Sequence, residues 1–208
     1  PSYPSPLASV IKRSFLCPLC SLVIHSAVAA GEKELSLLFL GDDGHHQPSL
    51  RARQLIPALA KRGIEVTYTN DVGDLNAKTL AAYDGLIVYA NHEKISPEQE
   101  KALLDYVADG HGFVPLVGGQ FKSHTTGTFR VNNVAPKHPI MQGFGGFESW
   151  DETYVHHRHG ADRTVLETRA EGDRDEPWTW VRTHGKGRVF YTAWGHDHRT
   201  WGEPGFHE

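Results

Sequence analysis

An apolar run that ends abruptly in a polar loop constrains the fold most strongly. Residues 35–40 read LSLLFL, and residues 41–46 read GDDGHH. A short, nearly continuous apolar run is typical of a strand covered on both faces, as in the parallel sheets of α/β proteins. Ligands of such sheets bind at the carboxyl ends of the strands. We therefore expect a functional site in the loop that follows residue 40.

After this first strand, helical and extended patterns alternate. Pro48 suits the first turn of a helix that runs to Gly63, and Ser96 followed by Pro97 marks the start of another. Apolar segments predict further strands at 65–70, 83–89 and 112–116. Strands that alternate with helices predict a parallel sheet with right-handed crossovers.

The alternation stops after Leu116. The next residues, VGGQFKSHTTGT, show no helical periodicity, although a parallel crossover usually includes a helix. Either the sheet becomes antiparallel here, or a crossover has been lost. Gly-rich and charged turns, notably 171–176 and 185–187, then separate short predicted strands at 129–134, 164–168, 178–183 and 188–192. We expect these strands to extend the sheet and to build a loop-rich edge.

The amino-acid composition limits the number of domains and the kinds of molecule that the protein is expected to bind. The 208 residues suffice for one domain with a substantial core. A formal charge of −4 with scattered Lys and Arg argues against nucleic acid as a partner. The chain has 14 histidines, which fit either a biased surface composition or a metal or acid–base site.

Residues 1–30 have the pattern of a secretory signal peptide. A basic pair at 12–13 precedes an apolar run at 14–24 and the small residues SAVAA, and the run is too short to anchor the chain in a bilayer. A buried N-terminal helix is the alternative. The signal predicts a single domain over 31–208 that is exported to the periplasm or the extracellular space. Both cysteines of the chain lie in the predicted signal, so the mature domain has no thiol.

Polar clusters follow the predicted strands at 35–40 and 83–89. Asp43, His45 and His46 lie after the first of these strands, and His92 lies after the second. The two loops fall at the same edge of a parallel sheet. Histidine is the commonest metal ligand, so His45, His46 and His196 are candidate ligands of a divalent metal such as zinc. Adjacent histidines rarely both face the same bound group, so we expect only one of His45 and His46 to take part.

The second half carries further clusters. Carboxylates beside aromatic rings, as in WDETYVHH at 150–157, suit carbohydrate recognition. Neighbours on a strand point to opposite faces, so only one of Asp151 and Glu152 is expected to line a given pocket. The pair His196 and Asp197 resembles a metal ligand with its orienting group, or a base with its partner. We predict these catalytic residues: His92, Asp151, Glu152, His196 and Asp197. We predict these substrate-binding residues: Asp43, His124, Trp150, Tyr154 and Trp194.

Several segments together resemble the trehalose utilisation (ThuA-like) domain family, in the version found in secreted proteins of planctomycete-type bacteria. They lie between residues 35 and 206, at 41–71, 121–131, 138–144, 150–159, 176–201 and 204–206. The resemblance implies a class I glutamine-amidotransferase-like (flavodoxin-like) fold. That fold is a three-layer α/β sandwich with a mostly parallel sheet.

The resemblance also implies a function. It points to the metabolism of trehalose-type glycosides or their 3-keto derivatives, and to association with cytochrome c or dehydrogenase-like modules. The alternative is a non-catalytic sugar-binding module of a larger secreted protein. Similar family members continue after the segment GFVPL with a His-containing turn and a helix, and end in a further helix. We therefore expect an incomplete domain, with a deletion after Leu116 and a truncated C-terminus, which would remove part of the pocket.

Overall fold

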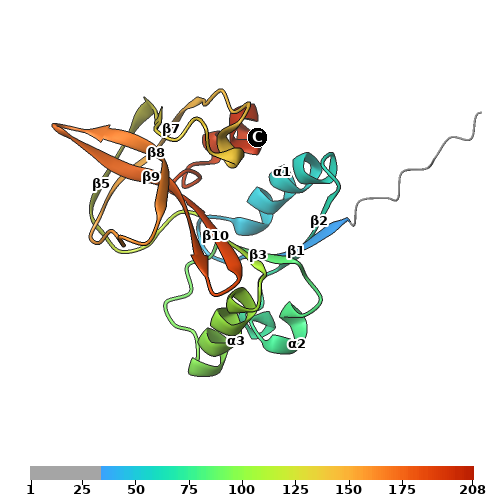
Figure 1. Ribbon diagram of the computed structural model, residues 1–208. Helices are drawn as coiled ribbons and strands as arrows, with labels where there is room; N and C mark the ends of the chain where they lie inside the picture. Colours follow the sequence, from blue (N-terminus) through green and yellow to red (C-terminus); the bar gives the residue numbers. More distant parts are fainter. Residues whose placement is uncertain (1–33) are drawn as a thin grey trace, which may run out of the picture. The chain divides into compact units, whose positions relative to one another are not determined.

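The computed structural model describes residues 34–208 (Figure 1). The predicted signal peptide lies outside the described residues. Within residues 34–208, no helix is both long enough and apolar enough to cross a membrane.

An eight-stranded sheet forms the centre of the described part. Its strand order is β2-β1-β3-β4-β10-β9-β8-β6. The first five of these strands run parallel to their neighbours, and the last three pair antiparallel. The strand bounds are β1 Leu35–Leu40, β2 Ile64–Thr69, β3 Gly85–Val88, β4 Gly112–Pro115, β6 Asn132–Asn133, β8 Thr164–Glu171, β9 Arg174–His184 and β10 Gly187–Thr192.

Helices cover both faces of the parallel part, as the three-layer prediction requires. Helix α1 (Pro48–Ala60) lies on one face, and α2 (Ala77–Leu80) and α3 (Pro97–Ala108) lie on the other (Figure 1). Because side chains alternate along a strand, Phe39 of β1 packs with α1, whereas Leu38 and Leu40 pack with α2 and α3. Both faces of β1 are thus buried, which explains its continuous apolar run.

Local sequence signals set the ends of the helices. Pro48 is the first residue of α1, as predicted. At α3, the Ser96 hydroxyl accepts a hydrogen bond from the Gln99 N–H, and the Gln99 side chain accepts one from the Ser96 N–H. This reciprocal capping satisfies two N–H groups that the helix itself cannot. The prediction of Ser96 as the N-cap is confirmed.

The chain leaves the main sheet after β4. Residues 116–120 lead without a helix into β5 (Phe121–Arg130), which pairs antiparallel with β7 (Glu148–His156) in a separate two-stranded sheet. The predicted strand at 129–134 covers the end of β5 and the whole of β6, but it omits most of β5. Most residues of β5 are exposed, so the strand lacks the alternation of apolar and polar residues by which a strand is predicted from sequence.

The predicted turn at 171–176 was too wide. Strand β8 continues to Glu171 and β9 begins at Arg174, so the hairpin turns within two residues. Glu176 consequently lies on β9 and is buried. The short elements that complete the chain are η1 Val72–Asp74, η2 Pro139–Met141, α4 His198–Gly202 and η3 Pro204–His207.

Candidate functional site

The loops after β1, β3 and β10 meet at the carboxyl edge of the sheet. The Asn91 N–H donates to the Asp42 carboxylate, which ties the first two loops together. The Tyr89 hydroxyl donates to the Gly195 carbonyl oxygen at 2.9 Å, which ties the end of β3 to the loop after β10. The expectation that the loops at 41–47 and 91–93 share one edge is confirmed.

Four side chains from separate segments converge at this edge, and we call them the histidine–glutamate cluster: His46, His124, Glu152 and His196. The Nε2 atoms of His46 and His196 are 3.0 Å apart. Oε1 of Glu152 is 3.6 Å from Nε2 of His196 and 4.0 Å from Nε2 of His124. Tyr154 borders the cluster, with its ring centroid 6.5 Å from that of His196.

The cluster combines partial burial with open access. Burial, together with the neighbouring His45 and His196, lowers the pKa of His46, so its imidazole is neutral at pH 7. The side chains of Glu152 and His196 are 16% and 27% exposed. A small molecule can therefore reach both groups. A carboxylate next to imidazoles is an arrangement that can accept and donate protons.

Asp151 has a different position from its neighbour Glu152. It is fully buried, and its carboxylate accepts hydrogen bonds from the N–H groups of Glu152, Gly195 and Asp197 and from the Thr200 hydroxyl, all at 2.8–2.9 Å. Burial raises its pKa, and these hydrogen bonds oppose that rise. The structure thus places Asp151 behind the loop that carries His196, whereas Glu152 faces the cluster.

Asp197 and Trp150 also make local contacts that hold their side chains. The Asp197 carboxylate caps α4 by accepting the Arg199 N–H at 2.9 Å, and it pairs with the Arg199 side chain at 2.6 Å. The Arg199 guanidinium also lies 3.7 Å from the ring centroid of Trp150. One face of the Trp150 indole is therefore covered.

The remaining predicted residues do not join the cluster directly. Nε2 of His92 lies 3.2 Å from the Gly41 carbonyl oxygen. The exposed Asp43 accepts a hydrogen bond from Asn70 at 2.7 Å. Trp194 is buried in the core, where its ring stacks on Phe129 with centroids 4.4 Å apart.

The geometry gives only partial support to a metal ion. The 3.0 Å between the ring nitrogens of His46 and His196 suits two ligands of one zinc ion. His45, however, packs against His46 with ring centroids 3.9 Å apart and the ring planes tilted by 40°. Among residues 34–208, no group of three or more His, Cys, Asp or Glu side chains is arranged to hold a metal ion. The described residues therefore do not form a complete metal site, and we derive no chemical step through a metal.

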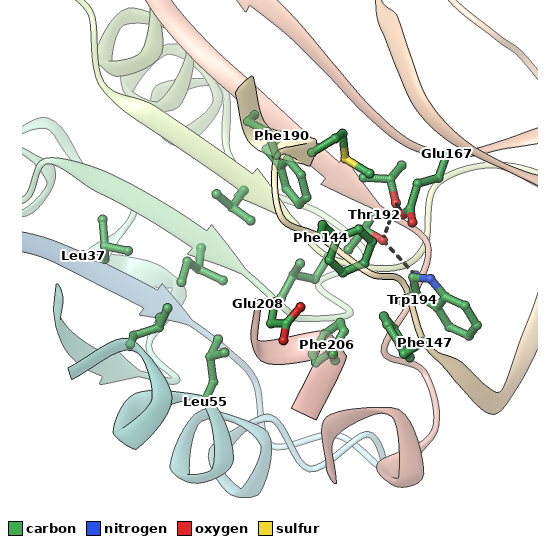
Figure 2. Close-up of a pocket in the computed structure, with 18 residues that line it drawn as sticks. Leu37, Leu55, Phe144, Phe147, Glu167, Phe190, Thr192, Trp194, Phe206 and Glu208 are labelled. Carbon is green, nitrogen blue, oxygen red and sulfur yellow. Dashed lines mark hydrogen bonds between the residues drawn. The ribbon is translucent and has the colours of Figure 1, made fainter. Parts of the chain in front are cut away.

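An apolar pocket of about 280 Å³ lies on the sheet face that α1 covers. Figure 2 shows Leu37 and Leu55 at one side of it and Glu167, Thr192 and Trp194 at the other. Burial raises the pKa of Glu167, whose carboxylate accepts the Thr179 hydroxyl at 2.6 Å. Of the predicted site residues, only Trp194 lines this pocket.

Sequence reasoning overlooked a second polar cluster at the end of β7. Nδ1 of His156 and Nε2 of His159 lie 3.0 and 3.1 Å from Oε1 of Glu176. Nε2 of His156 lies 3.0 Å from the Tyr191 hydroxyl. The HH pair at 156–157 is the only signal in the sequence, because the sequence pattern predicts a turn at 171–176, which includes Glu176.

Comparisons with known proteins agree with this architecture. Residues 36–208 match the model of the ThuA family, described as trehalose utilisation. A ThuA-like protein from Parabacteroides merdae superposes with a TM-score of 0.71 at 17% identity, over 84% of this chain and 86% of that chain. A ThuA-like protein from Bacteroides uniformis gives 0.69 at 16% identity, over 85% and 89%.

A cytoplasmic protein from Salmonella typhimurium gives a TM-score of 0.57 at 19% identity, over 83% of this chain and 92% of that chain. At these identities the similarity concerns the fold. No protein with a curated description matches the sequence.

Proposed function

This chain belongs to the trehalose utilisation (ThuA) family, and from that premise we propose that it acts in carbohydrate metabolism outside the cytoplasm. The proposed substrates are trehalose-type glycosides or their 3-keto derivatives. The observation that carries the proposal is the approach of the Glu152 carboxylate to His196 at 3.6 Å, at the edge of the sheet where three loops meet. Both side chains are open to a small molecule.

The number of available carboxylates favours a keto-sugar as the substrate. Hydrolysis by paired carboxylates needs two carboxyl groups on opposite sides of the glycosidic bond. Asp151 accepts four hydrogen bonds and Asp197 is held by Arg199, so neither is free for that role. Glu152 is then the one acidic member of the histidine–glutamate cluster. A single base suffices when a ketone makes the neighbouring C–H bond acidic.

In the proposed reaction, Glu152 removes the proton from the carbon between the ketone and the anomeric carbon. The electron pair of that C–H bond forms a C=C bond and expels the glycosidic oxygen, which takes a proton from the His196 imidazole. The products are an unsaturated keto-sugar and a free sugar. A dehydrogenase-like partner would supply the ketone and pass electrons to a c-type cytochrome.

Glu152→Gln tests the proposal. The amide keeps the size of the side chain but cannot accept the proton, so we expect cleavage of 3-keto-trehalose to fall by roughly 10²–10⁴-fold. Glu148→Gln on the same strand is the matched control, because Glu148 is exposed. Turnover that survives in Glu152→Gln, with the melting temperature unchanged, would refute the assignment of Glu152 as the base.

The second candidate function is a non-catalytic sugar-binding module. The direct passage from β4 to β5 through residues 116–120 favours it, because a crossover helix is absent there. This alternative predicts saturable binding of trehalose or 3-keto-trehalose and recovery of the sugar unchanged after long incubation. The divalent metal suggested by the histidine count stays a prediction, which elemental analysis of the purified chain would check.

A further inference from the structure

A pocket of about 230 Å³ lies beside the second polar cluster. Its walls include two arginines, Arg158 and Arg163, and the backbone of residues 118–120. Glu152, Tyr154 and His156 share one face of β7 because side chains alternate along a strand. Glu152 and His156 are four positions apart, which is about 13 Å along the strand. The pocket therefore lies further along β7 than the histidine–glutamate cluster.

Aromatic rings hold Arg163 in place, and among residues 34–208 it makes no direct ion pair. Its guanidinium lies 5.4 Å from the ring centroid of Trp180, and Trp180 stacks on Tyr191 with centroids 4.9 Å apart. Partial burial lowers the pKa of Arg163, and the attraction of Glu176 opposes that shift. Within residues 34–208, neither Arg163 nor Arg158 forms an ion pair or a hydrogen bond. The negative charges of Glu176 and Asp162 act on Arg163 only from beyond ion-pair distance. The N–H donors of its guanidinium therefore stay available to the oxygens of a ligand.

A left-handed turn among the lining residues carries backbone donors. Val117, Gly118 and Gly119 have φ values of 58°, 82° and 100°, a left-handed run that only glycine adopts readily. Within the described residues, no hydrogen bond engages the N–H groups of Gly118, Gly119 or Gln120. Successive backbone N–H groups in such a turn form a concavity suited to anions. The Tyr191 hydroxyl donates to the Gly118 carbonyl oxygen at 2.8 Å and ties this turn to the aromatic stack under Arg163.

The nearby carboxylate of Glu176 is engaged in hydrogen bonds. Burial alone would raise the pKa of Glu176, but hydrogen bonds from the backbone and ring of His156 and the charge of His159 outweigh burial and lower it. Its Oε1 atom accepts the His156 N–H at 2.9 Å and faces both imidazoles at 3.0–3.1 Å. The Oε1 atom of Glu176 is therefore occupied by His156 and His159 and not by an arginine.

We propose that this pocket, formed by Arg158, Arg163 and residues 118–120, binds a small oxyanion, the carboxylate or phosphate group of a ligand. A guanidinium presents N–H donors in a planar fork that matches two oxygens of either group. Because Trp180 and Tyr191 already orient Arg163, little side-chain freedom is lost on binding. The site is independent of the chemistry proposed for Glu152.

Calorimetric titration of the full chain with inorganic phosphate and with acetate, at constant ionic strength, tests this site. We expect saturable binding of at least one probe, and the probe that binds more tightly identifies the oxyanion. Arg163→Gln should weaken that binding roughly tenfold or more, because it removes charge-assisted hydrogen bonds. Arg158→Gln, at an exposed position, should weaken it less.

Arg174→Gln is the matched control. Arg174 is an exposed arginine at the start of β9 and is not among the residues that line the pocket, so its loss should leave the affinity unchanged. Absence of saturable binding of both probes at millimolar concentrations would overturn the proposal. Equal weakening by Arg163→Gln and Arg174→Gln would also overturn it, because non-specific attraction to surface charge would then explain the binding.

Discussion

Replacing Asp151 by asparagine should destabilise the protein and displace His196, although the side chain keeps its size. The carboxylate is fully buried, and it connects β7 to the loop after β10 and to α4. Oδ1 accepts the N–H groups of Glu152 and Asp197, and Oδ2 accepts the Gly195 N–H and the Thr200 hydroxyl. Every donor around Asp151 requires an acceptor.

The size of the effect follows from these four contacts. An amide has one oxygen. If that oxygen replaces Oδ1, it keeps two of the four contacts, those with the Glu152 and Asp197 N–H groups. The Thr200 hydroxyl can then rotate to accept from the amide nitrogen, but the buried Gly195 N–H faces another donor. One unsatisfied buried N–H and the loss of charge assistance together cost about 2–4 kcal/mol. Asp151→Ala frees both loop N–H groups and should cost about 3–5 kcal/mol.

Urea unfolding at pH 7, followed by tryptophan fluorescence, measures these free energies. The proposed cleavage activity should fall as well, because the Gly195 and Asp197 N–H groups flank His196. Asp162→Asn is the control, since it alters an exposed carboxylate and should change stability far less. A free energy of unfolding for Asp151→Asn within about 0.5 kcal/mol of the parent chain would refute the reasoning.

Three further predictions concern stability. Gly187→Ala should lower the free energy of unfolding by about 3 kcal/mol or more, because a Cβ there would overlap the Val107 carbonyl oxygen. Gly202→Ala is the control, because a Cβ at that position meets open space. Thermal unfolding compares the two variants. Ser96→Ala should cost about 1 kcal/mol by removing the α3 cap, seen as a lower urea midpoint. Burial lowers the pKa of His156, so the folded state binds its proton less tightly than the unfolded chain. The free energy of unfolding should therefore fall as pH drops below about 6.5, by up to about 1.4 kcal/mol per pH unit. His156→Gln should make this dependence on pH weaker. An unchanged dependence in the variant would contradict the prediction.

The first half of the fold was predictable because its signals are local. A strand buried on both faces needs a continuous apolar run, and residues 35–40 have one. The capping residues of α3 predict where that helix begins. Strand β5 was missed because most of its residues are exposed and its partner β7 lies further along the chain. Pairing with β7, rather than a pattern in β5 itself, makes these residues extended.

The sequence by itself determined that polar loops gather at the carboxyl edge of a parallel sheet and that Asp151 and Glu152 point to opposite faces. Only the tertiary structure decided that Asp151 holds the loop after β10 while Glu152 faces His196. The physical reason is that strand alternation separates two side chains, but the segments that meet each face come from elsewhere in the chain. Gly195, which donates to Asp151, is 44 residues away. The pocket formed by Arg158, Arg163 and residues 118–120 was not predictable for the same reason. Its glycine turn and its arginines are far apart in the sequence and meet only after the strands pair.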